Sequence, residues 1–84
     1  MSLNPLHGRP VAHAHLLAHQ ASPLSCVVFD VPLRARVTAQ TYGGDVVTVV
    51  ADVVARSGEW LCVAQDDNGS TWNVWVHKAC CEPV

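Results

Sequence analysis

Charged residues are scarce in this sequence, at 14% of 84 residues, and its five lysines and arginines leave a net charge of −2. So few basic side chains cannot form a stripe that neutralises several phosphates, so we expect no nucleic-acid partner. Half of the residues are hydrophobic, as in globular proteins, and the length allows one domain of marginal stability. The shortage of solubilising charge favours a further buried surface, either a docking face or a self-association interface.

Long apolar runs are also lacking. No stretch approaches the eighteen or so apolar residues of a membrane span, so we expect no membrane partner. The start of the chain does not have the form of a secretory signal, because Arg9 is the only early basic residue and two histidines interrupt the apolar run 11–17. We therefore expect a cytoplasmic protein. Removal of a leader segment would instead allow an envelope protein with affinity for the cell wall.

The four cysteines do not form a pattern typical of a disulfide framework. They are Cys26, Cys62 and the adjacent pair Cys80 and Cys81. Adjacent cysteines rarely bridge each other, because the small ring strains the peptide between them. With this sparse spacing in a cytoplasmic protein, we expect reduced thiols.

The N-terminal third predicts one helix. Residues 1–9 contain proline, glycine and asparagine and indicate an irregular arm. Pro10 then begins the segment 10–21, whose apolar residues recur at helical spacing. Pro23 follows and cannot continue a helix.

From residue 24 the pattern changes to short segments rich in β-branched residues and separated by turn residues. The clearest is 33–40, where apolar and polar residues alternate. The run 46–55 is apolar on both faces, which suits a central strand. The expected strands cover 24–31, 33–40, 46–55, 59–65 and 70–77, with a tight turn at 78–82. The sequence thus predicts a mainly β fold, a small barrel of about five antiparallel strands at 33–84, with the arm, helix and extended segment of 1–32 packed on it.

The C-terminal half resembles SH3-like domains, most closely the bacterial ones. The resemblance covers roughly residues 33–83 and is carried by Gly58-Glu59-Trp60-Leu61-Cys62-Val63, a turn with Asn68-Gly69, and Val74-Trp75-Val76-His77. It implies a five-stranded barrel in which Trp60 takes the place of the exposed groove tryptophan and Tyr42 lies in a loop that lines the groove. His77 and Cys80 stand where peptide-binding members have a proline and a tyrosine, so recognition of proline-rich peptides is not carried over.

Strand alternation places Leu61, Val63, Val74 and Val76 inward, and Trp60, Trp75 and His77 toward the surface or the N-terminal helix. Aromatic residues either complete the core of a small domain or form binding hot spots. We expect a non-enzymatic protein-binding module that acts as an adaptor, a complex subunit or a small inhibitor. Its candidate binding residues are Tyr42, Trp60, Trp72, Trp75 and His77. A homodimer through the valine strand Val46–Val54 is a further expectation.

A small zinc-binding or redox-sensing protein is the alternative from another class. His77 and Cys80 form an H-x-x-C unit with Cys81 beside it, and His15 and His19 are four residues apart. Zinc needs four converging ligands, and the sequence has no C-x-x-C unit, so we expect no metal and no cofactor. A nucleophilic cysteine needs an oriented base, and nothing in the sequence orients His77, so we expect no enzyme.

Overall fold

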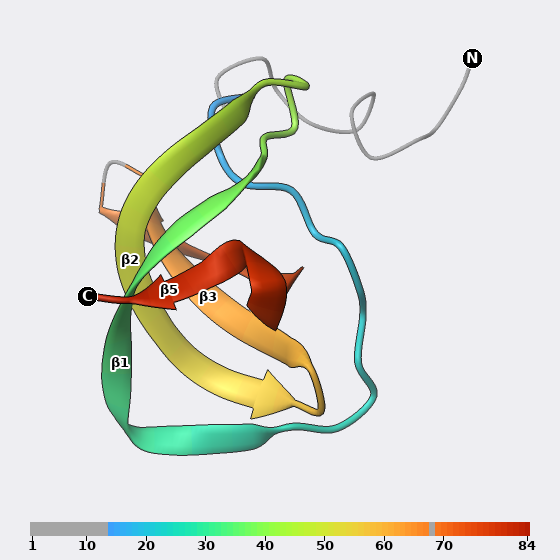
Figure 1. Cartoon of the computed structure of the whole chain (residues 1–84), viewed down its shortest axis with the longest axis vertical. Coiled ribbons are helices and arrows are strands. Elements are labelled where there is room, and N and C mark those ends of the chain that lie inside the picture. The colour runs from blue at the N-terminus through green and yellow to red at the C-terminus, as the bar shows by residue number, and fades with distance from the viewer. Residues whose placement is uncertain (1–13, 68) are drawn as a thin grey trace.

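The computed structural model describes residues 14–67 and 69–84, which form one antiparallel sheet with the strand order β4-β3-β2-β1-β5 (Figure 1). Consecutive strands pair along the chain, and β5 returns to the far edge of β1. The elements are β1 (Val27–Gln40), β2 (Val46–Ser57), β3 (Trp60–Asp67), β4 (Ser70–His77), the single 3₁₀ turn η2 (Lys78–Cys80) and β5 (Cys81–Pro83).

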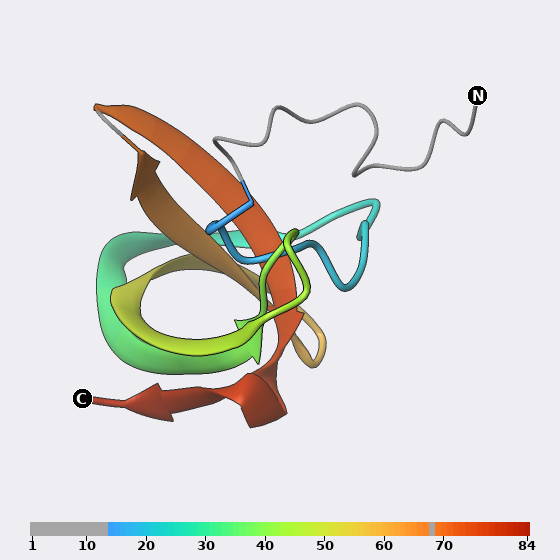
Figure 2. The same ribbon diagram turned by 90° about the horizontal axis from the view of Figure 1, so that it is seen from above.

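The predicted mainly β fold and its antiparallel strands are confirmed, but the closed barrel is not. β1 and β2 curve together through much of a ring, and β5 lies against the outside of this ribbon (Figure 2). β4 and β5 remain the two outer strands, so the sheet is open. Right-handed twist and bulges bend a sheet, whereas closure also requires the last strands to meet.

The predicted helix over 10–21 is wrong for its described part. Residues 14–21 contain no helix, and Leu17 instead forms an isolated bridge with Thr41. The amides of Ala18 and Gln20 donate to the oxygens of Gln40 and Trp75, at 3.0 and 2.8 Å. A twelve-residue helix is marginal alone, and here the sheet accepts the hydrogen bonds that a helix would make internally. Residues 10–13 lie outside the described part.

Two of the predicted strands are one strand. The segments 24–31 and 33–40 join in β1, which continues through Pro32, so residues 27–32 belong to the sheet itself. The pairing with β2 slips between Val28 and Leu33, and this bulge accommodates the proline. The fifth strand is β5. Its first two residues lie in the segment predicted as a tight turn at 78–82, and its third residue follows that segment.

The core lies on the concave face of the sheet. In β1 the alternation predicted for 33–40 is confirmed from Ala35 on, because Ala35, Val37 and Ala39 are buried and the residues between them are exposed, but Leu33 is 58% exposed. Val74 and Val76 also point inward as predicted. The core cluster comprises Leu17, Ala35, Val37, Ala39, Ala51, Val53, Val63, Val74 and Val76, with Leu61 partly buried against it.

Candidate functional site

Three of the five candidate binding residues lie together. Trp60 pairs with His77 across β3 and β4, and Trp75 pairs with Cys62 one step along the same face. The rings of Trp60 and His77 meet edge to face, with their centroids 5.2 Å apart. All three candidate side chains are half-buried. We call Trp60, Trp75 and His77 the aromatic face.

The other two candidates lie elsewhere. Tyr42 is buried, with 6% of its surface exposed, and its amide donates to the oxygen of Leu16 at 2.9 Å. Trp72 pairs with Gln65, and strand alternation places it on the side of the sheet opposite the aromatic face. Tyr42 therefore contributes to packing, and the structure brings together only Trp60, Trp75 and His77.

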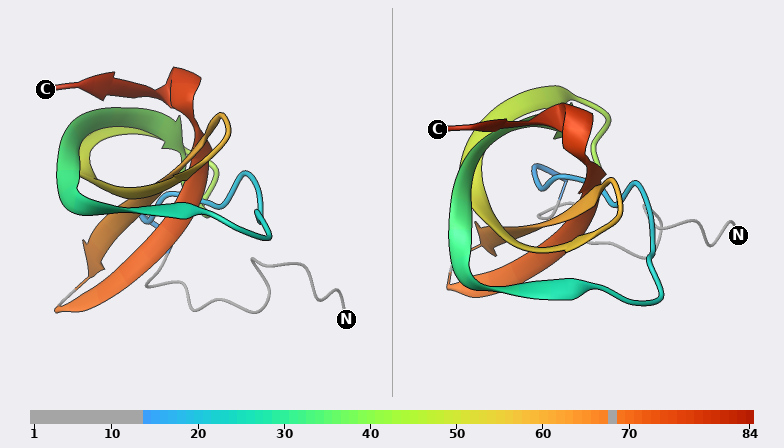
Figure 3. Two further views of the ribbon diagram at one scale, coloured as in Figure 1. Left: turned by 90° about the horizontal axis from the view of Figure 1, so that it is seen from below. Right: turned by 60° about the horizontal axis from the view of Figure 1, so that its bottom comes forward.

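The chain's own N-terminal segment lies along the aromatic face. We call residues 17–26 the N-terminal strap; in both views of Figure 3 it passes beside the end of β4. His19 Nδ1 accepts from the Trp75 amide at 3.3 Å, and Gln20 Oε1 accepts from the His77 amide at 2.9 Å. The strap thus takes up the outer backbone hydrogen bonds of β4 beside this face.

His77 has a local structural role. Its Nδ1 accepts from the Ala79 amide at 3.0 Å and caps η2. This bond leaves Nε2 to carry the proton in the neutral ring, and Nε2 lies 3.4 Å from a carboxylate oxygen of Glu59. The ring is thereby held between β3 and the turn, with one nitrogen already in use.

The cysteines are unpaired, and two of them are poor nucleophiles. Burial raises the pKa of the Cys81 thiol, with a further contribution from Cys80. Burial likewise raises the pKa of the Cys62 thiol, with a further contribution from Cys26. A reactive cysteine needs the opposite shift, because the thiolate is the attacking species.

The residues of the predicted zinc or redox site do not converge with further ligands. Over residues 14–67 and 69–84, no three side chains of histidine, cysteine, aspartate or glutamate are grouped as metal ligands. The Cys80 sulfur instead accepts from the side-chain Nε2 of Gln20 at 3.7 Å, and the Cys81 thiol donates to the His77 backbone oxygen at 3.9 Å.

An apolar groove that the sequence analysis missed lies between β1, the start of β3 and the C-terminal residues. It has a volume of about 480 Å³. Its lining includes Phe29, Leu33, Val53, Leu61, Pro83 and Val84. Beside it, the first half of β1 exposes Val27, Val28, Val31 and Leu33, which we call the β1 corner surface. The signal in the sequence was the run VVFDVPL, which is too apolar to leave a purely polar outer face.

A second cleft, of about 460 Å³, opens where β3 diverges from β2. Its lining is more polar and includes His15, Asp52 and Asp66. His15 Nε2 lies 3.4 Å from a carboxylate oxygen of Asp67. The strand predicted to form a homodimer borders this cleft, but β2 is an inner strand between β1 and β3.

No family model, curated protein or solved structure matches this chain. In the part of the chain that the structure describes, no helix is both long and apolar enough to cross a membrane.

Proposed function

We propose that this chain is a non-enzymatic protein-binding module of SH3-like architecture, acting as an adaptor, a complex subunit or a small inhibitor. Five antiparallel strands, with β5 returning to β1, support that architecture. The observation that carries the function is the β1 corner surface beside the apolar groove. Several exposed apolar side chains along one strand beside an apolar groove are typical of docking sites rather than of ordinary protein surface.

The docking surface that we propose is this corner and not the aromatic face. Trp75 and His77 are half-buried and the strap takes up their backbone amides, whereas Val31 is 73% exposed. The raised thiol pKa values and the engaged Nδ1 of His77 support a binding role over cysteine chemistry.

The test is site-specific photo-crosslinking in cells that make the protein. A photoreactive amino acid at Val31 is expected to give a discrete covalent adduct. The matched control places it at Thr48, an exposed residue on β2 away from the corner, where no such adduct is expected. If position 31 gives no adduct, or the same adducts as position 48, the corner is not a docking surface.

A further inference from the structure

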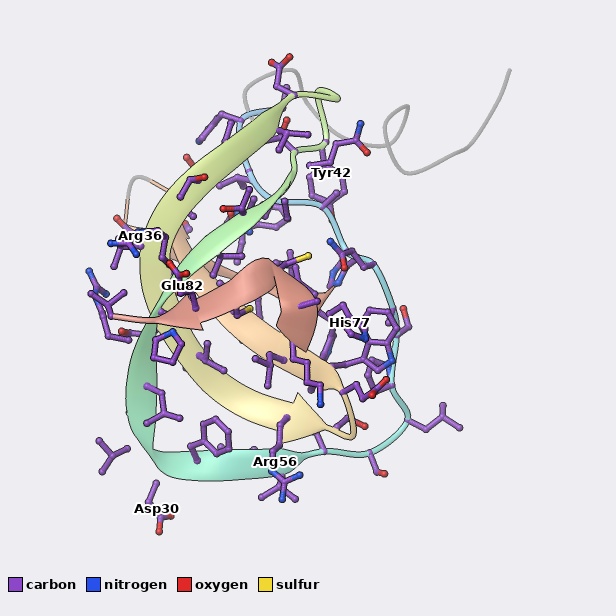
Figure 4. All side chains as sticks on the ribbon, in the orientation of Figure 1. Asp30, Arg36, Tyr42, Arg56, His77 and Glu82 are labelled. Atoms are coloured by element: carbon purple, nitrogen blue, oxygen red, sulfur yellow. The ribbon has the colours of Figure 1, made fainter. Side chains whose placement is uncertain are left out.

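The β1 corner surface carries two unpaired charges of opposite sign. Asp30 and Arg56 are both exposed, and neither forms an ion pair with any residue in 14–67 or 69–84. Figure 4 shows both side chains on the same edge of the molecule, pointing away from its body. Arg56 lies opposite Val27 in the β1–β2 register, and Asp30 directly precedes Val31 in β1.

Arg56 differs in this respect from the other basic side chains of the described residues. Arg34 bonds Asp52 at 3.0 Å, Arg36 bonds Glu82 at 2.8 Å, and Lys78 lies 3.9 Å from Glu59. Each of these partners belongs to the same chain. A surface that leaves one cation and one anion unpaired beside an apolar patch is complementary to a surface of the same kind.

We propose that the β1 corner surface docks a second copy of this chain about a two-fold axis. This inference rests on the proposed function, because it names the partner of that surface. In a two-fold interface the same patch meets itself, so Asp30 of one copy meets Arg56 of the other, and the reverse. Val27, Val31 and Leu33, which strand alternation places on one side of β1, then form the apolar centre, with the charges at the rim, as is typical of homodimers.

The edge of β1 argues against an extended peptide as the occupant. The Arg34 oxygen accepts from the Val84 amide, so the backbone groups of residue 34 face the β5 side. By strand alternation the backbone nitrogen of Pro32 faces the same side, and proline has no N–H to donate. Strand addition therefore lacks a donor at this point. Docking through side chains suits a folded partner, and a second copy presents both charges.

The test is sedimentation velocity on the purified full chain over a concentration series. The wild type is expected to convert from monomer to dimer as concentration rises. Val31→Asp places a charge in the apolar centre and is expected to weaken the dimer at least about 100-fold. The matched control is Val46→Asp, because Val46 is 70% exposed on β2, away from the corner, and its loss leaves the dimer unchanged. Circular dichroism confirms that each variant is folded.

Charge reversal then tests the two-fold arrangement. Asp30→Arg and Arg56→Asp each create like charges across the axis and are expected to weaken the dimer about tenfold. The double variant restores opposite charges and returns the dissociation constant to within a few-fold of the wild type. A wild type that stays monomeric over the whole concentration series contradicts the proposed dimer. A double variant whose dissociation constant does not return toward that of the wild type contradicts it as well. If position 31 still crosslinks a different protein, only this inference fails; if it crosslinks nothing, the proposed function fails as well.

Discussion

At the scale of single residues, the Gln65 side chain supplies hydrogen bonds that a neighbouring strand would otherwise make to the backbone of Leu17. It is buried, at 9% exposed, and its Oε1 accepts from the Leu17 amide at 2.7 Å. Its Nε2 donates to the Leu17 oxygen at 3.3 Å. One amide group thus satisfies both backbone groups of a residue that lies 48 positions away. Buried backbone groups need such partners, so Gln65 fixes where the strap begins.

We therefore expect Gln65→Leu to lower the free energy of unfolding by about 3 kcal/mol. The substitution leaves a buried donor and a buried acceptor without partners, and each costs about 1–3 kcal/mol. Urea denaturation followed by circular dichroism measures the loss. Gln40→Leu is the matched control, because Gln40 bonds the Gly44 oxygen at the exposed surface and its loss costs less than about 1 kcal/mol. Equal losses in the two variants would contradict this role.

The buried thiol of Cys62 makes the free energy of unfolding fall as the pH becomes alkaline. Burial, and to a smaller extent Cys26, raises its pKa above the ordinary value of 9.0. The unfolded chain therefore ionises this thiol at lower pH than the folded chain does. The stability that follows from the neutral thiol is complete below about pH 9 and is lost as pH rises through the raised pKa.

We expect the free energy of unfolding to fall less steeply above about pH 9 in Cys62→Ala than in the wild type. One thiol contributes at most about 1.4 kcal/mol per pH unit to this slope. Urea denaturation at several pH values measures it. Cys26→Ala should keep most of the wild-type slope, because burial is the larger cause of the shift. An unchanged slope in Cys62→Ala would assign the alkaline loss to other groups.

At the scale of elements, the strap is the part that local pattern could not reveal. The spacing of Leu16 and Leu17 within 10–21 fits a helix, yet both side chains are buried against a sheet whose residues are far away in the sequence. Tyr42 is buried for the same reason, since its loop folds back onto Leu16. Contacts with residues far away in the sequence decide where these side chains lie, and the local spacing of apolar residues does not reveal such contacts.

The elements that local pattern did predict are the hairpins. Alternation gave the inward residues of the second half of β1 and of β4, and glycines mark the turns that join the strands. Gly58 and Gly69 have positive φ, at 60° and 87°, which most other residues disfavour. Part of the candidate site could be predicted, because Trp60, Trp75 and His77 do lie on one face. The β1 corner surface was missed, because Pro32 suggested a break in the chain where β1 in fact continues.

Two leucines of the same region give a sharp test of the strap. Leu17 is 0% exposed in the core cluster, whereas Leu24 is fully exposed. Leu17→Ala should cost about 2–5 kcal/mol, as is usual for a buried leucine. Leu24→Ala should change stability by less than about 0.5 kcal/mol. Thermal and urea unfolding compare the two variants, and similar losses would show that the strap does not anchor through Leu17.

At the scale of the whole molecule, the margin of stability is narrow. A domain of 84 residues is stabilised by roughly 4–13 kcal/mol, at about 0.05–0.15 kcal/mol per residue. Loss of one anchor such as Leu17 removes a large part of that. The ion pairs add little, because Arg34–Asp52 is exposed to solvent, as is Arg36–Glu82 (Figure 4). Association is therefore an effective means of stabilising a chain of this size.

If a second copy covers the corner, the thermal midpoint depends on protein concentration. We expect it to rise by about 3 °C for each tenfold increase in concentration above the dimer dissociation constant. Differential scanning calorimetry measures this shift. In Val31→Asp the midpoint should stay constant over the same range. A constant midpoint in the wild type, at concentrations where sedimentation shows a dimer, would mean that unfolding is not coupled to dissociation.

Pro32 has a consequence for chains that are not yet folded. The run VVFDV before it combines β-branched and aromatic residues, the composition from which amyloid-like stacks form. During synthesis or transient opening this run can meet the same run of a neighbouring chain. Asp30 and Pro32 then act as gatekeepers, because stacked carboxylates repel and a proline interrupts the hydrogen-bond ladder of a fibril. By this principle the two residues limit the aggregation of unfolded chains through the run VVFDV.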